Sequence, residues 1–154
     1  RADRHLQPFP LRDIIAVRVK KIFPDPVWKR RYKHVLDFES MLAEEGTVII
    51  KLFLNISKEE QKKRLESRLQ DPDKLWKFCM DDLDDRNRWD EFQTAYQDLI
   101  EKTSTPEAPW YIIPADRKWY RNLVVARLMV EKLRHLQLSL PTPNFDPASI
   151  IIPD

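Results

Sequence analysis

The chain has 154 residues, of which 42% are hydrophobic and 34% are charged, and this length suffices for one domain with a hydrophobic core. Its formal net charge is only +2, so bulk binding to nucleic acid is not expected. The longest apolar run, about eight residues, falls far short of the roughly 20 that span a bilayer. A single cysteine excludes an intramolecular disulfide and favours a reducing, cytoplasmic compartment.

The first predicted element follows an irregular segment at residues 1–12, in which prolines break regular structure. Residues 13–19 are apolar and β-branched, which favours a strand, although a short buried helix fits equally well. Apolar residues at helical spacing then predict an amphipathic helix that starts after Pro26 and ends at Gly46, its C-terminal cap. Residues 47–55 form the clearest predicted strand, of the nearly continuous apolar type that is buried on both faces of a parallel sheet.

A helix N-terminus is encoded at Ser57. Its hydroxyl suits an N-cap, and Glu60 three residues later completes a capping box. The helix is expected to run to about Leu69 and to stop before Pro72, because the residue preceding a proline disfavours the helical region. Further on, apolar residues at helical spacing predict one long helix over residues 81–103.

A second buried strand is predicted at residues 108–115, followed by a helix from about 117 to 136 and an extended, proline-rich tail at 141–154. Trp and Tyr side chains are interpreted most simply as core. The order is therefore helix, strand, a long helical excursion, strand and helix. Two strands alone make a poor sheet, so the pattern is that of the second half of a layered α/β domain.

The chain resembles the polyphosphate kinase 2 family of polyphosphate-dependent nucleotide phosphotransferases. The resemblance lies in five segments that occur in family order: IIAVRV, VWKRRY, DFESMLAEEGTVIIKLFLNISKEEQKKRLESRLQDPDKLWKF, RNRWDEFQTAYQDLIEKTST and APWYIIPADRKWYRNL. It assigns the family domain to residues 13–140 and places residues 13–19 in a helix. It also implies an α/β fold of the P-loop kinase type, a three-layer sandwich with a helical lid at about residues 57–104.

This resemblance implies a Mg²⁺-dependent kinase that transfers phosphoryl groups between inorganic polyphosphate and AMP, ADP or, in reverse, ATP. It further implies a homo-oligomer, and from charge and apolar run length we expect neither nucleic acid nor a membrane as partner. The single glycine excludes the family's glycine-rich Walker A loop from these residues. We therefore expect only the second half of the fold here, with the Mg²⁺ ligands in the other half and no activity of this segment alone. A non-catalytic polyanion-binding module or a structural module is the alternative.

Arg64 and Arg68 are the candidate catalytic residues. They lie four residues apart and share one face of a predicted helix. Arginine binds phosphate oxygens in a planar, often bidentate way, and a closing lid can supply cations to phosphoryl transfer. From the residues alone, pairing with Glu60 and similar acids on a solvated face explains both arginines as well. The resemblance favours the functional interpretation, most strongly for Arg68.

Further cations of the same region are expected to extend an anion-binding track, namely Lys63, Lys74, Lys77 and Arg86. Asp116 and Lys118 follow the second predicted strand, where ligands bind in α/β sheets, and the resemblance places them near the nucleotide. Asp116 could also be the N-cap of the next helix.

Two charged features each allow two interpretations. The acidic run at residues 81–85 suits Mg²⁺, but we favour a helix N-terminus there, so no metal ligand is assigned to this chain. Arg18, within an apolar stretch, either pairs inside the fold or reaches the phosphate cleft.

Overall fold

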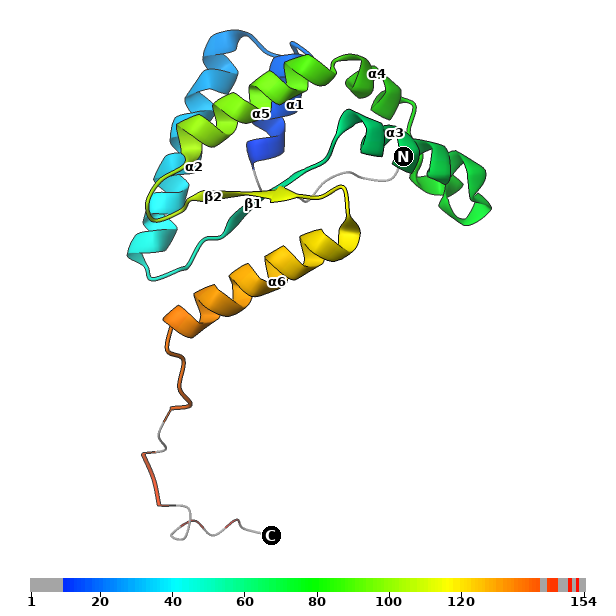
Figure 1. Ribbon diagram of the computed structural model, residues 1–154. Coiled ribbons are helices and arrows are strands. Elements are labelled where there is room, and N and C mark those ends of the chain that lie inside the picture. The colour runs from blue at the N-terminus through cyan, green and yellow to red at the C-terminus, as the bar shows by residue number, and fades with distance from the viewer. Residues whose placement is uncertain (1–9, 142–143, 147–149, 151, 153–154) are drawn as a thin grey trace.

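The computed structural model describes residues 10–141, 144–146, 150 and 152. Its elements are helices α1 (Pro10–Val19), α2 (Asp25–Glu44), α3 (Lys58–Gln70), α4 (Asp81–Asn87), α5 (Trp89–Thr103) and α6 (Lys118–His135), the 3-10 helix η1 (Pro72–Lys77), and strands β1 (Lys51–Asn55) and β2 (Trp110–Pro114). The strands pair in parallel, with Lys51 opposite Trp110 and Asn55 opposite Pro114. Helices α1, α2 and α5 lie on one side of this sheet and α6 on the other (Figure 1). The described fold is thus α/β, mostly helical around a small parallel sheet.

The region between the strands divides into two parts. Residues 58–87, which comprise α3, η1 and α4, extend to one side of the sheet (Figure 1), and we call them the projecting segment. Helix α5 instead packs in the core, where Ala95 and Leu99 join buried residues of α1 and α2. The core therefore contains the last third of the predicted lid region, and the first part of that region lies outside it.

Helix α1 corrects the strand that the residues alone favoured at 13–19. Ile14, Ile15 and Val19 are buried against α2 and α5, and this packing outweighs the β-propensity of the branched side chains. The helix implied by the family resemblance is confirmed. It begins at Pro10, so the predicted irregular segment is wrong for residues 10–12, while residues 1–9 lie outside the described part.

Gly46 ends α2 as predicted. Its φ is +82°, a left-handed conformation that favours glycine. The Gly46 N–H donates to the Ala43 carbonyl at 3.0 Å, and the Thr47 N–H donates to the Leu42 carbonyl at 2.9 Å. This pair of bonds is a Schellman motif, which satisfies carbonyls at the helix end and turns the chain toward β1.

Burial of the first strand on both faces was a wrong prediction. Residues 47–50 do not pair, and in the paired part Leu54 is 47% exposed. Strand β1 pairs with β2 along one edge, and no other described strand lies along its second edge. A parallel strand is normally buried because further strands and helices surround it, and these two strands have few such neighbours.

The long helix predicted at 81–103 is two helices, α4 and α5, that meet at Arg88. Arg88 leaves the helical region with φ −100° and ψ 28°. Its guanidinium donates to the Val19 carbonyl at the end of α1 at 2.9 Å. This tertiary contact to a carbonyl at a helix end stabilises the bend. Sequence periodicity cannot predict such a contact.

A buried polar network joins α2, β1 and α5. The Lys51 ammonium donates to the Glu39 carboxylate at 2.6 Å and to the Thr103 carbonyl, and both charged side chains are at most 6% exposed. The same ammonium lies 5.4 Å from the Trp110 ring centroid, and the Trp110 indole N–H donates to the Thr103 hydroxyl at 2.9 Å. One lysine therefore ties the first strand to the C-terminal end of α5.

Helix α6 contradicts the interpretation of all Trp and Tyr side chains as core. No residue of α6, which is described throughout, is buried, and Trp119 is 63% exposed. Trp76 in η1 is 78% exposed, with Lys77 stacked over its ring at 5.0 Å. Trp28 and Tyr32 are buried as expected. Within the described residues, no helix combines the length and apolar character that crossing a bilayer requires.

Arg18 pairs inside the fold. Its guanidinium donates to the Asp98 carboxylate at 2.5 Å and lies 5.2 Å from the Trp28 ring centroid, which joins α1 to α5 and α2. The Arg18 hydrogen bond is the main cause that lowers the pKa of Asp98 below its ordinary value of 3.8, and burial opposes it. The alternative, that Arg18 reaches a phosphate cleft, is not what the structure shows.

The Arg18–Asp98 pair predicts a pH dependence of stability. Because the pKa of Asp98 is lowered on folding, its stabilisation is fully present above the unfolded value of 3.8 and is lost as pH falls through the folded pKa. Asp98→Asn is expected to lower the free energy of unfolding by up to about 1 kcal/mol at neutral pH, since the pair is partly exposed. Urea unfolding of both proteins at neutral pH and near pH 3 checks this, and an equal difference at both pH values would contradict it.

Candidate functional site

The carboxyl ends of β1 and β2 are joined by Ser57 and Asp116. The Ser57 hydroxyl accepts the Glu60 N–H at 3.1 Å, as predicted for the N-cap of α3. In a full capping box the Ser57 N–H would donate to the Glu60 side chain. Here it donates to the Asp116 carboxylate at 2.7 Å instead. Asp116, in the loop after β2, therefore contributes to the cap of α3. It does not cap α6, whose N-cap is Arg117 without a side-chain cap bond.

The Ser57 cap is testable. Ser57→Ala is expected to lower the free energy of unfolding by about 1 kcal/mol, because the Glu60 N–H loses its acceptor. Ser67→Ala makes the same chemical change at an exposed position within α3 and is expected to be neutral or slightly stabilising. Chemical denaturation of both variants provides the measurement, and equal effects would show that the cap is not what stabilises α3.

Arg64 is engaged in contacts that connect α3 to the loop after β2. Its Nε donates to the Glu60 carboxylate at 2.8 Å, and its Nη2 donates to the Ala115 carbonyl at 2.7 Å and the Asp116 carbonyl at 3.4 Å. The pairing with Glu60 that the residues alone allowed is present. These bonds orient the projecting segment relative to the strand ends, and they occupy most of the donors of Arg64.

Arg68, one turn further along α3, is much less constrained. Its Nη1 lies 3.3 Å from the Asp82 carboxylate of α4, and both side chains are more than one third exposed, at 37% and 39%. An ion pair this long and this exposed is weak. The two arginines share a helix face, but only Arg68 keeps most of its donors available to an anion.

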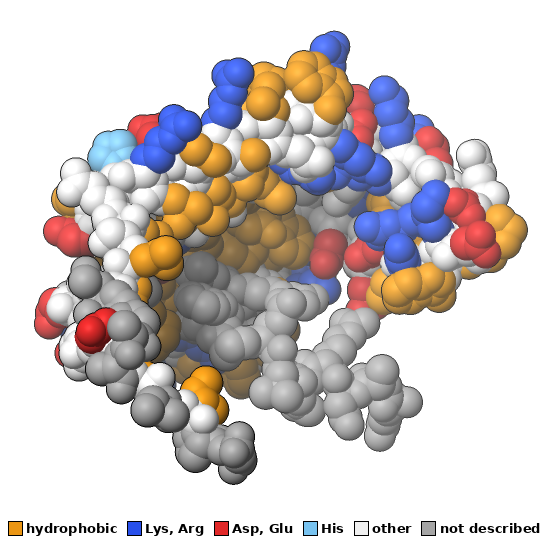
Figure 2. All heavy atoms as spheres, turned by 90° about the horizontal axis from the view of Figure 1, so that it is seen from below, with side chains coloured by type: hydrophobic (Ala, Val, Ile, Leu, Met, Phe, Trp, Pro, Cys, Tyr) orange, Lys and Arg blue, Asp and Glu red, His pale blue; other side chains and the backbone are white. Residues whose placement is uncertain are grey.

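The remaining predicted cations lie in different surroundings. Arg86 donates to the Lys58 carbonyl at 2.7 Å and the Gln61 side-chain oxygen at 3.0 Å, and so fastens α4 to the start of α3. Lys74 pairs with Asp71, whose pKa this bond lowers. Lys63 and Lys118 are exposed, and no described residue forms an ion pair with either. At the right of Figure 2, where the projecting segment lies, Lys and Arg side chains are mixed with Asp and Glu.

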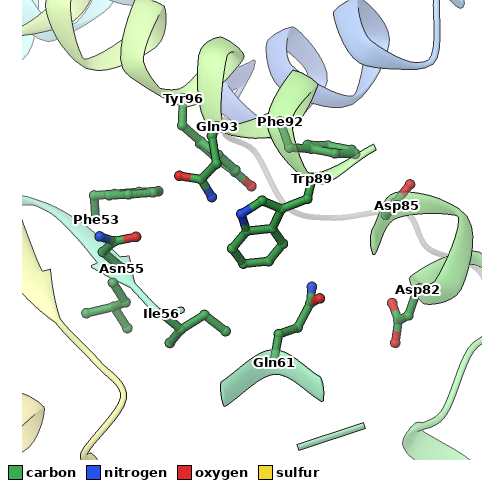
Figure 3. Close-up of a pocket in the computed structure, with 11 residues that line it drawn as sticks. Phe53, Asn55, Ile56, Gln61, Asp82, Asp85, Trp89, Phe92, Gln93 and Tyr96 are labelled. Atoms are coloured by element: carbon green, nitrogen blue, oxygen red, sulfur yellow. The ribbon is translucent and has the colours of Figure 1, made fainter. Parts of the chain in front are cut away.

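A cavity of about 310 Å³ lies between the carboxyl end of β1, the projecting segment and α5. The Trp89 indole stands in its middle, with Phe53 and Tyr96 on one side and the Asp82 and Asp85 carboxylates on the other (Figure 3). Its lining also includes Leu54, Asn55, Ile56, Gln61, Phe92 and Gln93. Flat rings and amides beside carboxylates make a surface that can stack against a planar group and hydrogen-bond to its edge.

The sequence prediction missed this cavity, because Trp89 lies inside the single long helix predicted at residues 81–103. A signal was present in the pattern Trp89, Gln93, Tyr96, since a Gln at helical spacing between two aromatic residues is unusual for a buried face. The bend at Arg88 is what brings α4, with Asp82 and Asp85, to the opposite wall.

A second hollow, of about 350 Å³, lies beside the loop that contains Asp116. Ile112, Ala115, Arg117 and Tyr120 contribute to its lining. Asp116 is part of this hollow as well as the cap of α3, whereas Lys118 is not among the lining residues. The structure thus brings one of the two predicted nucleotide residues to a concave surface.

A metal site in the described part of the chain would be expected among clustered His, Cys, Asp and Glu side chains. No group of three or more His, Cys, Asp or Glu side chains there is arranged to hold an ion. Asp81 and Asp82 lie in the first turn of α4, as the helix-start interpretation predicted. The start of α4 therefore explains Asp81 and Asp82, and no described residue is assigned to Mg²⁺.

Residues 11–140 match the family described as polyphosphate kinase 2. This chain belongs to that family. The sequence is 51% identical over 140 residues to the AMP/ADP-polyphosphate phosphotransferase of Meiothermus ruber, a match that covers 91% of this chain and 52% of the relative. It is 39% identical over 119 residues to the ADP-polyphosphate phosphotransferase of Rhodopseudomonas palustris, which covers 77% and 41% of the two chains.

The fold agrees with a solved structure of the family. The crystal structure of polyphosphate kinase 2 from Arthrobacter aurescens TC1 superposes with a TM-score of 0.85 at 46% identity, over 90% of this chain and 49% of that chain. The chain spans about half the length of these family members. The order of elements predicted from the sequence is therefore a family arrangement, of which this chain contains about one half.

Proposed function

We propose that this chain is part of a kinase that transfers phosphoryl groups between inorganic polyphosphate and nucleoside mono- or diphosphates. One geometric observation carries the proposal: a cation-bearing projecting segment lies against the carboxyl end of β1, where ligands bind in α/β sheets. The names of the relatives supply the substrate classes. By the same analogy, the complete fold is the P-loop kinase three-layer sandwich, and the projecting segment is the moving part of its lid.

In the proposed reaction, an acceptor phosphate oxygen attacks the terminal phosphorus of polyphosphate. The bond from that phosphorus to its bridging oxygen breaks, and the shortened polyphosphate leaves with the electron pair. Negative charge spreads over the oxygens around the transferred phosphorus, so positioned cations accelerate the step. Arg68 has donors available for these oxygens, whereas direct contact by Arg64 requires its bonds to Glu60 and Ala115 to open. We therefore propose that Arg68 contacts the anion first and that Arg64 mainly positions α3.

The other assignments extend this proposal along the surface. Polyphosphate beyond the reacting end is proposed to run over the cations Lys63, Lys74, Lys77 and Arg86. The nucleotide is proposed to border the Asp116 loop, with Lys118 at the start of α6 able to attract its phosphates. Magnesium, when bound, neutralises phosphate charge, and we assign its ligands to no residue of this chain.

Two further proposals concern the protein as a whole. A homo-oligomer is expected from the resemblance, and the uncovered apolar side chains of α6, such as Trp119, favour association. A cytoplasmic location stays a prediction that rests on the single cysteine.

A chimeric enzyme tests the proposed function. The segment of the Meiothermus ruber relative that matches this chain is replaced by this chain, and the unaltered relative serves as positive control. With Mg²⁺ and polyphosphate, the chimera is expected to convert AMP to ADP and ADP to ATP. A folded chimera that shows no turnover with either acceptor would sink the proposal.

The second candidate is a polyanion-binding module without catalysis, for which the exposed cations of the projecting segment would suffice. Binding of polyphosphate by the 154-residue chain, together with an inactive but folded chimera, would support this candidate over the kinase.

A further inference from the structure

The arginines of the projecting segment differ in their hydrogen-bond partners. Arg64 and Arg86 donate to backbone carbonyls as well as to side chains, so part of each guanidinium is used within the protein. Among the described residues, Arg68 has one carboxylate partner, Asp82. An anion that binds the exposed guanidinium of Arg68 therefore encounters the Asp82 carboxylate already bound there.

Asp82 and Arg68 come from different helices, 14 residues apart in sequence. Their contact crosses from α4 to α3, and the Asp82 side chain also lines the cavity in Figure 3. A carboxylate and a phosphate oxygen use the same guanidinium donors, so the two cannot occupy the same edge of Arg68 together. Phosphate groups in a chain offer many such oxygens, and the single carboxylate offers two.

We propose that Asp82 is an affinity-setting residue that occupies the anion-binding edge of Arg68 and is exchanged for polyphosphate when the anion binds. This inference rests on the proposed function, because it deepens the role of Arg68 in the same site. Asp82 acts through Arg68 and is a positioning residue. Its release also frees α4 from α3 at this point, while Arg86 keeps the two helices connected through Lys58 and Gln61.

The experiment measures binding of sodium polyphosphate of defined length to the 154-residue chain by calorimetry at several salt concentrations. Asp82→Asn removes the competing charge and is expected to tighten binding about two- to fivefold, the range that exposed ion pairs span. Asp81→Asn is the matched control, since it removes the same charge from the same turn of α4 with no described partner. Asp82→Glu keeps the carboxylate and is expected to bind polyphosphate with the same affinity as the unaltered chain.

A double-variant cycle separates competition from general repulsion. In an Arg68→Ala background, Asp82→Asn is expected to have no more effect than Asp81→Asn, because the residue through which it acts is gone. Equal effects of Asp82→Asn and Asp81→Asn with Arg68 intact would overturn the inference, and so would weaker binding by Asp82→Asn. If no variant and no unaltered chain binds polyphosphate, the proposed function itself fails, an outcome distinct from a binding chain in which Asp82 is inert.

Discussion

Lys51→Met is expected to lower the free energy of unfolding by about 3–5 kcal/mol, the usual effect of removing one partner from a buried ion pair. The Glu39 carboxylate, 4% exposed, would be left without its cation. The Thr103 carbonyl would lose a donor, and the Trp110 ring would lose the ammonium beside it. Methionine keeps the length and apolar stem of lysine, so the effect reports the charge.

Denaturant unfolding of three variants decides this prediction. Lys33→Met breaks the exposed Lys33–Asp37 pair within α2 and is expected to change stability by about 0.5 kcal/mol or less. The double variant Lys51→Met with Glu39→Leu is expected to recover much of the lost stability, because no buried charge remains unpaired. A single Lys51→Met variant as stable as Lys33→Met would show that the network does not hold β1 to α5.

The Glu39–Lys51 ion pair of this network could not be predicted from the sequence. Glu39 lies at helical spacing with buried Trp28 and Val35, and Lys51 lies inside the apolar run of the first strand. Each position alone is an exception to a pattern, and a burial pattern assigns charges to the surface. Two opposite exceptions on neighbouring buried elements are the signal of an internal pair. That pairing becomes visible only when α2 and β1 are known to be neighbours.

Two local capping signals were reliable. The Gly46 cap and the Ser57 cap depend on bonds within a few residues, and both form as predicted. Contacts between distant segments were not predictable, because periodicity carries no information about them. Asp116 bonding to Ser57, and Arg88 bonding to Val19, each join residues more than 50 positions apart. These contacts form the site, so the order of elements followed from the sequence while the geometry of the site did not.

Arg68→Ala is expected to weaken polyphosphate binding by about tenfold to one hundredfold while leaving stability nearly unchanged. A hydrogen bond to a charged partner contributes about 1.5–3 kcal/mol, which corresponds to that range of affinity. Stability is expected to change little, because the only described partner of Arg68 is the exposed Asp82 at 3.3 Å. Calorimetric binding and thermal unfolding of the same sample provide the two measurements.

Arg64→Ala and Arg127→Ala make this prediction specific. Arg64→Ala removes bonds to Glu60 and to the Ala115 carbonyl and is expected to lower the free energy of unfolding by about 1–3 kcal/mol, since partly buried acceptors lose their donor. Arg127→Ala removes an exposed cation from α6 and is expected to change neither quantity beyond the loss of one distant charge. If Arg127→Ala weakens binding as much as Arg68→Ala, affinity follows net charge and not the arginine of the projecting segment. If Arg64→Ala loses affinity without losing stability, the two arginines have the reverse of the roles that their contacts indicate.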